Sequence, residues 1–473
     1  FASSRGAALI AASVISALVA QAATATGSAN DSDGSDVEKQ LRLMEQRMTE
    51  MEDRLQATTT ALEAAKSQVD EQQERLSEAG LVEVDERGAR SGVGNFVELV
   101  EVSGVFASSF NYRFLDPGDN NRNVFGSFRH PNADTFQIDQ AWITLDKTPT
   151  EESRGGFHVD YVWGETAEVQ GGDRDSGLIY TAYVSYLAPV GNGVQVDAGR
   201  LPKVLGAESM QTNQNFNISQ GLLFQLQPNA TTGVQASTEV ADGLVLTGGV
   251  VNDVFRASNV DTGRDKAYYG KVSFVQERFG VDVGAIWGKD DTIVDDTGTG
   301  TACDSGGECF TSVFDVVARA YPTDAIQLWL DYTWARTHGN DAADGDVHGI
   351  AGAGRLALNE DTGVSTRVEY VRADRTFVRS HGLAGTPLAP PSAPVGPFGA
   401  VNGPGGSSGT SQIVSWTTTV DHRLAEGLKL RGEVRWDRNL SDNSALFASG
   451  GGATQFSDRT DQVTGLAEIF YEF

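Results

Sequence analysis

Residues 427–437 read GLKLRGEVRWD. Apolar and charged residues alternate along most of this stretch. Successive side chains of an extended strand point to opposite faces, so this segment has one face of Leu, Val and Trp and an opposite face that is fully charged. The last segment, 459–473, alternates in the same way and ends on an aromatic residue. Both patterns indicate strands whose two faces meet different surroundings.

Sixteen such segments follow one another from Asn95 to the end of the chain. They are 95–111, 135–147, 155–164, 177–187, 192–200, 231–240, 243–252, 267–277, 279–289, 310–320, 324–336, 347–358, 363–373, 411–423, 427–438 and 459–473.

The gaps between these segments alternate strictly between short and long. Outer-membrane β-barrels have this layout, with short periplasmic turns, long extracellular loops and an even number of strands. Within hydrocarbon, only a closed barrel pairs every backbone group of a sheet. The sequence therefore predicts an all-β fold, a 16-stranded antiparallel transmembrane β-barrel over 95–473, with apolar residues outside and polar residues inside.

One residue departs from this pattern. In the segment 324–336, Ile326, Leu328 and Leu330 share the apolar face, but Trp329 has the parity of the polar face.

The composition excludes several other classes of protein. About 40% of the residues are hydrophobic, yet no run of 18 apolar residues occurs, which excludes a helical membrane protein. The net charge of −28 and the pI near 4.5 argue against nucleic acid as a partner. In a barrel only alternate residues face lipid, which explains why no long apolar run is present.

The N-terminal region carries two further signals. Residues 1–25 have one Arg, an apolar stretch too short to span a bilayer and then small residues, which predicts a secretory signal peptide. After a linker over 26–36, apolar residues recur at alternating steps of four and three over 37–79, which predicts an α-helical coiled coil that lies in the periplasm. A linker over 80–94 follows. The coil should make the chain self-associate, although its seam fixes neither two nor three helices, and a helix packed on its own domain remains the alternative.

A barrel of sixteen strands is wide enough for a water-filled channel. We expect the long gap 201–230 to fold inward and narrow that channel, with amide side chains as hydrogen-bonding sites for polar solutes; an outward loop at a subunit contact is the alternative. The candidate pore residues are Gln211, Asn213, Gln214, Asn215, Asn217 and Gln220.

The predicted lumen face carries charges of both signs. An excess of acid favours weak cation preference, and the alternative is a wall of salt-bridged side chains without effect on selectivity. The candidate lumen charges are Asp160, Asp197, Asp331, Arg367, Glu369, Lys429, Arg431, Glu433 and Arg435.

The predicted loop 290–309 holds both cysteines, Cys303 and Cys309. In an exported protein this spacing predicts a disulfide. The same loop is acidic, and we expect loose divalent cation bridging to lipopolysaccharide there, with no specific metal site. Catalytic motifs and a haem-attachment motif are absent, so we expect no enzyme activity and no cofactor.

Three stretches resemble the OmpL-like family of β-barrel porins: FQIDQAW at 136–142, GFHVDYVWG at 156–164 and DAGR at 197–200. The order of signal peptide, coiled coil and barrel is also similar to that of the DcaP-like trimeric porins. These resemblances imply a diffusion channel of the bacterial outer membrane that forms a homotrimer.

The sequence thus favours a porin that admits small polar solutes by passive diffusion. Two alternatives stay open: a structural or tethering barrel that oligomerises through its coiled coil, and the barrel sheath of a larger membrane complex. Open-channel currents in planar bilayers distinguish the porin from both.

Overall fold

The structure is a computed structural model that describes residues 100–114, 124, 127–255, 266–289, 310–338, 345–374, 410–440 and 460–473, together with Gln56 and the strand residues 84–85 and 88–89. The chain divides into two units, Phe1–Val97 and Glu98–Phe473. In the first unit, β1 (Val84–Asp85) pairs with β2 (Gly88–Ala89) as a small antiparallel ladder. The predicted signal peptide, both linkers and the predicted coiled coil lie outside the described residues, apart from these few positions.

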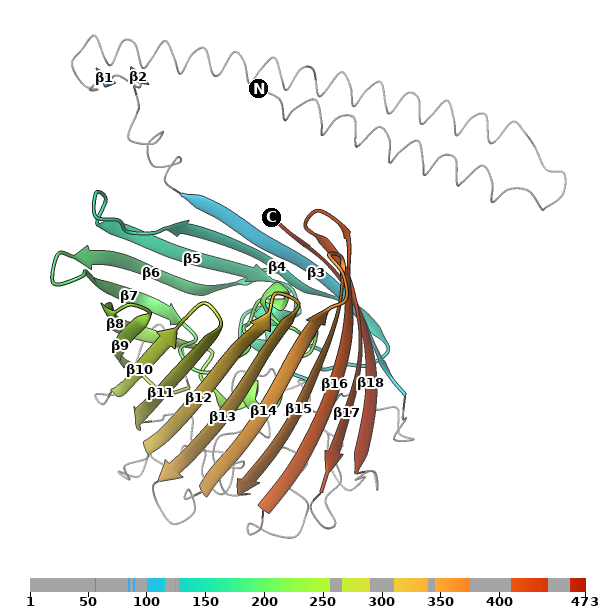
Figure 1. Ribbon diagram of the computed structural model, residues 1–473. Coiled ribbons are helices and arrows are strands. Elements are labelled where there is room, and N and C mark those ends of the chain that lie inside the picture. Colours follow the sequence, from blue (N-terminus) through green and yellow to red (C-terminus); the bar gives the residue numbers. More distant parts are fainter. Residues whose placement is uncertain are drawn as a thin grey trace. The chain divides into compact units, whose positions relative to one another are not determined.

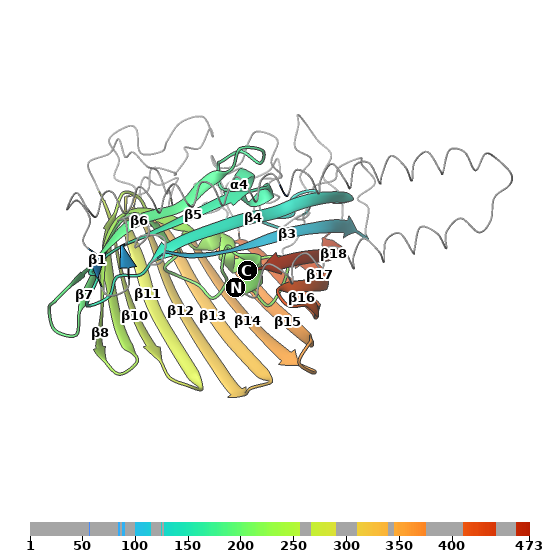
Figure 2. The same ribbon diagram turned by 90° about the horizontal axis from the view of Figure 1, so that it is seen from above.

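The second unit is a closed barrel of sixteen antiparallel strands, in which β18 returns to pair with β3 (Figures 1 and 2). The predicted fold class is therefore confirmed. The strands are β3 (Glu101–Arg113), β4 (Thr135–Lys147), β5 (Gly155–Trp163), β6 (Leu178–Ala188), β7 (Val194–Pro202), β8 (Ala230–Ala241), β9 (Leu244–Val251), β10 (Ala267–Val275), β11 (Phe279–Lys289), β12 (Phe310–Thr323), β13 (Ile326–His338), β14 (Gly345–Ala357), β15 (Thr362–Asp374), β16 (Thr410–Ala425), β17 (Leu428–Asn439) and β18 (Asp461–Glu472).

Connections between these strands are short at one end of the barrel and mostly long at the other. The turn between β16 and β17 contains Gly427, whose φ of +72° is open to glycine and strained for other residues. The turn between β8 and β9 contains Gly243 at a φ of +70° for the same reason. Tight turns of this kind fix the register of the strands that they join.

The alternation in 427–437 is realised by β17. Leu430 and Val434 are exposed on the outer surface, whereas Arg431, Glu433 and Arg435 are buried inside the barrel. The outward apolar residues of all sixteen strands form the surface that would face lipid. Among the described residues, no helix is long and apolar enough to cross a membrane; the short α4 (Glu165–Val169) follows β5.

The long connection 203–229, between β7 and β8, lies inside the ring of strands (Figures 1 and 2). It contains two short 3-10 turns, η1 (Thr212–Gln214) and η2 (Leu223–Leu226). We call 203–229 the lumen loop.

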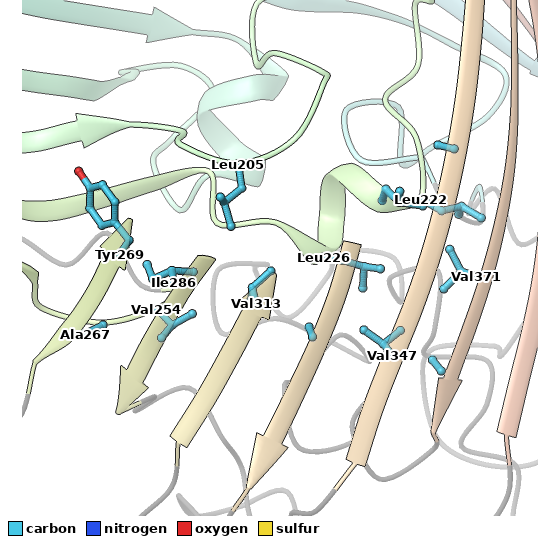
Figure 3. Packing of buried hydrophobic residues seen from close by; sticks show 14 of the residues in the cluster. Leu205, Leu222, Leu226, Val254, Ala267, Tyr269, Ile286, Val313, Val347 and Val371 are labelled. Carbon is cyan, nitrogen blue, oxygen red and sulfur yellow. The ribbon is translucent and has the colours of Figure 1, made fainter. Parts of the chain in front are cut away.

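An apolar cluster joins the lumen loop to the inner wall (Figure 3). The loop supplies Leu205, Leu222 and Leu226, and inward positions of β10–β16 supply the opposite side. A second cluster packs Met210 and Phe224 of the loop against the wall from β3 to β6 and β18. Its wall residues include Val105, Ala107, Trp142, Val162, Tyr180 and Phe470.

The polar inner face that the alternation predicts is therefore not continuous, because part of the wall is apolar. Val313, Val347 and Val371 face inward and are almost fully buried. The lumen loop covers these three valines, so their apolar surface is removed from water. The barrel thus has a core of its own, placed between the loop and the strands.

Candidate functional site

Leucine side chains of the lumen loop fit opposite inward-facing glycines of the wall. A Cβ atom at Gly284 on β11 would lie 2.6 Å from Leu205 Cδ2, and one at Gly349 on β14 would lie 2.8 Å from Leu223 Cδ1. Both distances are shorter than carbon atoms tolerate. Because glycine has no side chain, these two wall positions leave room for the leucine side chains of the loop.

Carboxylates of the wall accept hydrogen bonds from backbone N–H groups of the loop. Glu433 accepts from Ile218 N at 2.6 Å and from Ser219 N at 3.2 Å. Glu369 accepts from Leu222 N at 2.8 Å and from Leu223 N at 3.3 Å. An irregular buried segment has no ladder to satisfy its main chain, so the wall supplies the partners.

Two aspartates hold the start and the end of the loop together. Asp315 on β12 accepts from Gly206 N at 2.9 Å, and Asp331 on β13 accepts from Ala207 N at 2.8 Å. Near the loop's end, the Gln227 amide donates to the same two carboxylates at 3.0 and 3.1 Å. Positions some twenty residues apart in the loop thus share one anchor.

Three arginines on β15 and β17 donate hydrogen bonds to backbone carbonyl oxygens of the loop. Arg367 on β15 donates to Ser219 O at 2.7 Å and Arg435 on β17 donates to Gln220 O at 2.9 Å. Arg431 on β17 donates to the carbonyl oxygens of Thr212 and Asn215, at 3.2 and 3.1 Å.

Each of these three arginines also forms an ion pair with a carboxylate, so none of them is a buried charge without a counter-charge. Arg367 bonds Glu208 of the loop at 2.5 Å and Glu369 at 3.1 Å. Arg431 bonds Glu468 through Nε at 2.7 Å, and Arg435 bonds Asp437 at 2.9 Å. Removing one partner of such a pair leaves an uncompensated charge, which is strongly destabilising.

Most of the predicted lumen charges are therefore buried. Six of them bind the lumen loop directly: Asp331, Arg367, Glu369, Arg431, Glu433 and Arg435. Lys429 keeps about a third of its side chain exposed and pairs with Glu472 at 3.0 Å. The sequence placed these side chains inside the barrel but did not indicate what they would bind.

The two remaining charges sit in networks within the wall. Asp160 accepts from Trp142 Nε1 at 3.0 Å and Thr144 Oγ1 at 2.6 Å, and also contacts His158 Nε2 at 3.0 Å. Asp197 accepts from Ser185, Gln195 and Gln235 at 2.6 to 2.9 Å. Both carboxylates are buried and fully occupied by polar partners.

The six predicted pore amides lie on the lumen loop but differ in their surroundings. Asn215 binds the backbone N and O of Ser209, at 2.7 and 2.8 Å, and so stabilises the loop itself. Asn217 donates to Thr419 at 2.7 Å and Asn213 donates to Glu472 at 3.1 Å, while Gln220 is buried.

Gln214 is exposed and Gln211 is partly exposed, and their amides bond each other at 2.6 Å. These two amides are the ones best placed to meet a solute.

The structure adds two loop anchors that the sequence pattern did not single out. The parity of β4 places Gln140 on the inner face, where it donates to Met210 O at 2.7 Å. Arg129 donates to the same carbonyl at 2.6 Å, and burial lowers the pKa of its guanidinium. Arg129 lies in a loop without periodicity, so no pattern could have found it.

Lys203 is half-buried at the start of the lumen loop. Its Nζ lies 3.9 Å from the centroid of the Phe224 ring and donates to Gln227 Oε1 at 2.8 Å. Burial lowers the pKa of Lys203 to about 8, while the nearby carboxylates of Asp331, Glu208 and Asp315 act in the opposite direction.

Within the described parts of the chain, no group of His, Cys, Asp or Glu side chains is arranged to hold a metal ion. Cys303, Cys309 and the acidic loop around them lie outside the described residues, so the disulfide and the cation bridging stay predictions.

Comparisons with known proteins agree with this architecture. A family model described as "Putative beta-barrel porin-2, OmpL-like" matches residues 99–473. The structure is similar to the anion-selective porin of Comamonas acidovorans, with a TM-score of 0.50 and 13% identity over 79% of this chain and 99% of that one. This likeness shows a shared fold.

Two further structures score slightly lower. The channel DcaP of Acinetobacter baumannii gives a TM-score of 0.47 at 10% identity, over 79% of this chain and 97% of that one. The trimer form of OmpT from Vibrio cholerae gives 0.49 at 12% identity, over 79% and 99%. No protein of curated function matches the sequence.

Proposed function

Because this chain belongs to the OmpL-like family of β-barrel porins, we propose that it is an outer-membrane porin through which small polar solutes diffuse passively. The lumen of the barrel is the path, and the lumen loop narrows it. Lumen-facing side chains and an inward loop set the selectivity of such a channel.

The observation that carries this proposal is the attachment of the lumen loop to opposite sides of the wall. Gly206 binds β12, Leu222 binds β15, and Thr212 binds β17 and β18. Met210 binds Gln140 on β4, which lies across the ring from β12. A segment held at these points crosses the lumen and reduces its open cross-section. Gln211 and Gln214 then offer amides to solutes in the remaining space.

A deletion tests the role of the loop. Removing 211–220 takes out the exposed amides together with the contacts to Arg431 and Glu433, so we expect a higher single-channel conductance in planar bilayers. The control is the double change Gln211→Ser and Gln214→Ser, which keeps the backbone anchors and alters solute contacts alone. An unchanged conductance after the deletion contradicts the constriction.

The tight attachment of the loop also favours a second candidate function. A lumen loop fastened along most of its length is compatible with a closed barrel, which serves as a structural or tethering element or as the sheath of a larger complex. Purified protein that inserts into planar bilayers without open-channel currents would support this candidate. Currents graded by solute size would support the porin.

We further propose that the chain forms a homotrimer, with its coiled coil in the periplasm and its exposed outer surface in contact with lipid, lipopolysaccharide and neighbouring barrels. Support comes from the heptad pattern over 37–79 and from the large apolar side chains exposed on the strands. Native mass spectrometry of the detergent-solubilised protein checks it. We expect a trimer, and fewer or weaker trimers when Leu41, Leu55 and Leu62 are changed to Asp.

A further inference from the structure

Trp329 on β13 faces the lumen, although its neighbours Leu328 and Leu330 face outward. It is partly buried and packs against the apolar cluster beneath the lumen loop. Trp142, which also has inward parity, is 1% exposed and its indole N–H binds Asp160 and Thr144. The indole of Trp142 is thus closed to solutes. The indole of Trp329 is partly exposed on the inner wall, where a solute can reach it.

Two arginines flank this indole. Arg319 on β12 is the direct cross-strand partner of Trp329. Arg355 on β14 is its diagonal neighbour, because Trp329 pairs with Ala353 on that strand. Diagonal neighbours on one face of a sheet lie within reach of long side chains. Each arginine side chain is more than a quarter exposed, at 29% and 28%.

Charges of both signs surround this indole. Asp331, the next inward residue on β13, is buried and already accepts from Ala207 N at 2.8 Å and from the Gln227 amide at 3.1 Å. Arg319 bonds Asp282, and Arg355 bonds Asp421 at 2.6 Å through Nη2 and 3.2 Å through Nε. These contacts leave further N–H groups on each guanidinium. Lys271 on β10 adds a third cation near Asp282. The partly exposed guanidinium groups of Arg319 and Arg355 are therefore the charges beside the indole that can still bind an anion.

We propose that Trp329, Arg319 and Arg355 form a binding subsite for aromatic carboxylates in the lumen, which we call the Trp329 subsite. A flat ring stacks against the indole, and the carboxylate binds a guanidinium in the planar geometry that arginine favours. This inference rests on the proposed channel function, because it names a class of solute that the channel would accept.

Binding can be measured without any current. Saturation-transfer NMR on the purified, detergent-solubilised protein reports contact with benzoate and with cyclohexanecarboxylate, which has the same charge but no aromatic ring. We expect benzoate to bind about two- to tenfold more tightly, as ring stacking in proteins contributes. Equal binding of the two acids overturns the subsite.

Variants assign the contact. Trp329→Leu keeps apolar packing beneath the loop and should abolish the preference for benzoate, whereas Trp416→Leu, on the exposed outer surface, should leave it intact. Arg355→Gln should weaken benzoate binding and leave benzyl alcohol unaffected. Unchanged benzoate binding in Trp329→Leu contradicts the proposal.

The two proposals fail in different ways. Binding without currents refutes the channel and keeps the subsite, whereas currents without a benzoate preference refute the subsite and keep the channel.

Discussion

At the scale of single residues, the position of the lumen loop depends on glycines of the wall, which leave space for its leucines. Gly349 faces inward and touches Leu223, so a larger residue there displaces the loop. We expect Gly349→Val to cost about 1–3 kcal/mol of stability, as overpacking does, and to raise the conductance. Thermal unfolding in detergent measures the first effect.

Gly432→Val is the matched control, because a Cβ atom at Gly432 would meet no atom within 4 Å. If both variants lose the same stability, the cost comes from valine in a strand and the fit of Leu223 is irrelevant.

At the scale of elements, the strands hold the lumen loop chiefly through its main chain. Changing Glu433→Leu removes the acceptor for Ile218 N and Ser219 N and leaves both buried without a partner. Each orphaned donor costs about 1–3 kcal/mol. We expect the loop to become a site of limited proteolysis and the conductance to fluctuate.

Glu433→Gln retains one side-chain oxygen as an acceptor, so its effect should be smaller than that of Glu433→Leu. Equal effects of the two variants would show that charge, and not hydrogen bonding to the loop, is what matters at this position.

There is a physical reason why the contacts of the lumen loop could not be predicted from the sequence. Arg431 binds Thr212 across 219 residues of chain, and its partner is a carbonyl oxygen, which every residue type possesses. The order of side-chain types along the sequence therefore cannot indicate such a bond. The sequence did hold two hints that something apolar lies inside, namely Trp329 on the polar face and the run Leu222–Phe224.

At the scale of the whole molecule, lipid makes the fold predictable. Each strand must alternate because one face meets hydrocarbon and the other does not, and each backbone group must be paired. The predicted segment 279–289 therefore coincides with β11, and 135–147 with β4. Where the inner face meets protein and not water, as at Val313 and Val347, the expected polarity fails.

Closure of the ring gives a prediction at this scale. Deleting 461–473 removes β18 and leaves β3 and β17 with unpaired edges in the membrane. We expect no folded barrel, seen as loss of the heat-modifiable band in gel electrophoresis. Deleting 211–220 breaks no strand pairing and should keep that band. A folded band from the β18 deletion would contradict the requirement for closure.

The anchors of the lumen loop also bear on the order of assembly. Arg431, Glu433 and Glu468 lie on β17 and β18, which are synthesised more than 200 residues after the loop they hold. Until those strands arrive, the loop has no partner for much of its main chain. Seating the loop and joining the two ends of the sheet should therefore be a single late event in biogenesis.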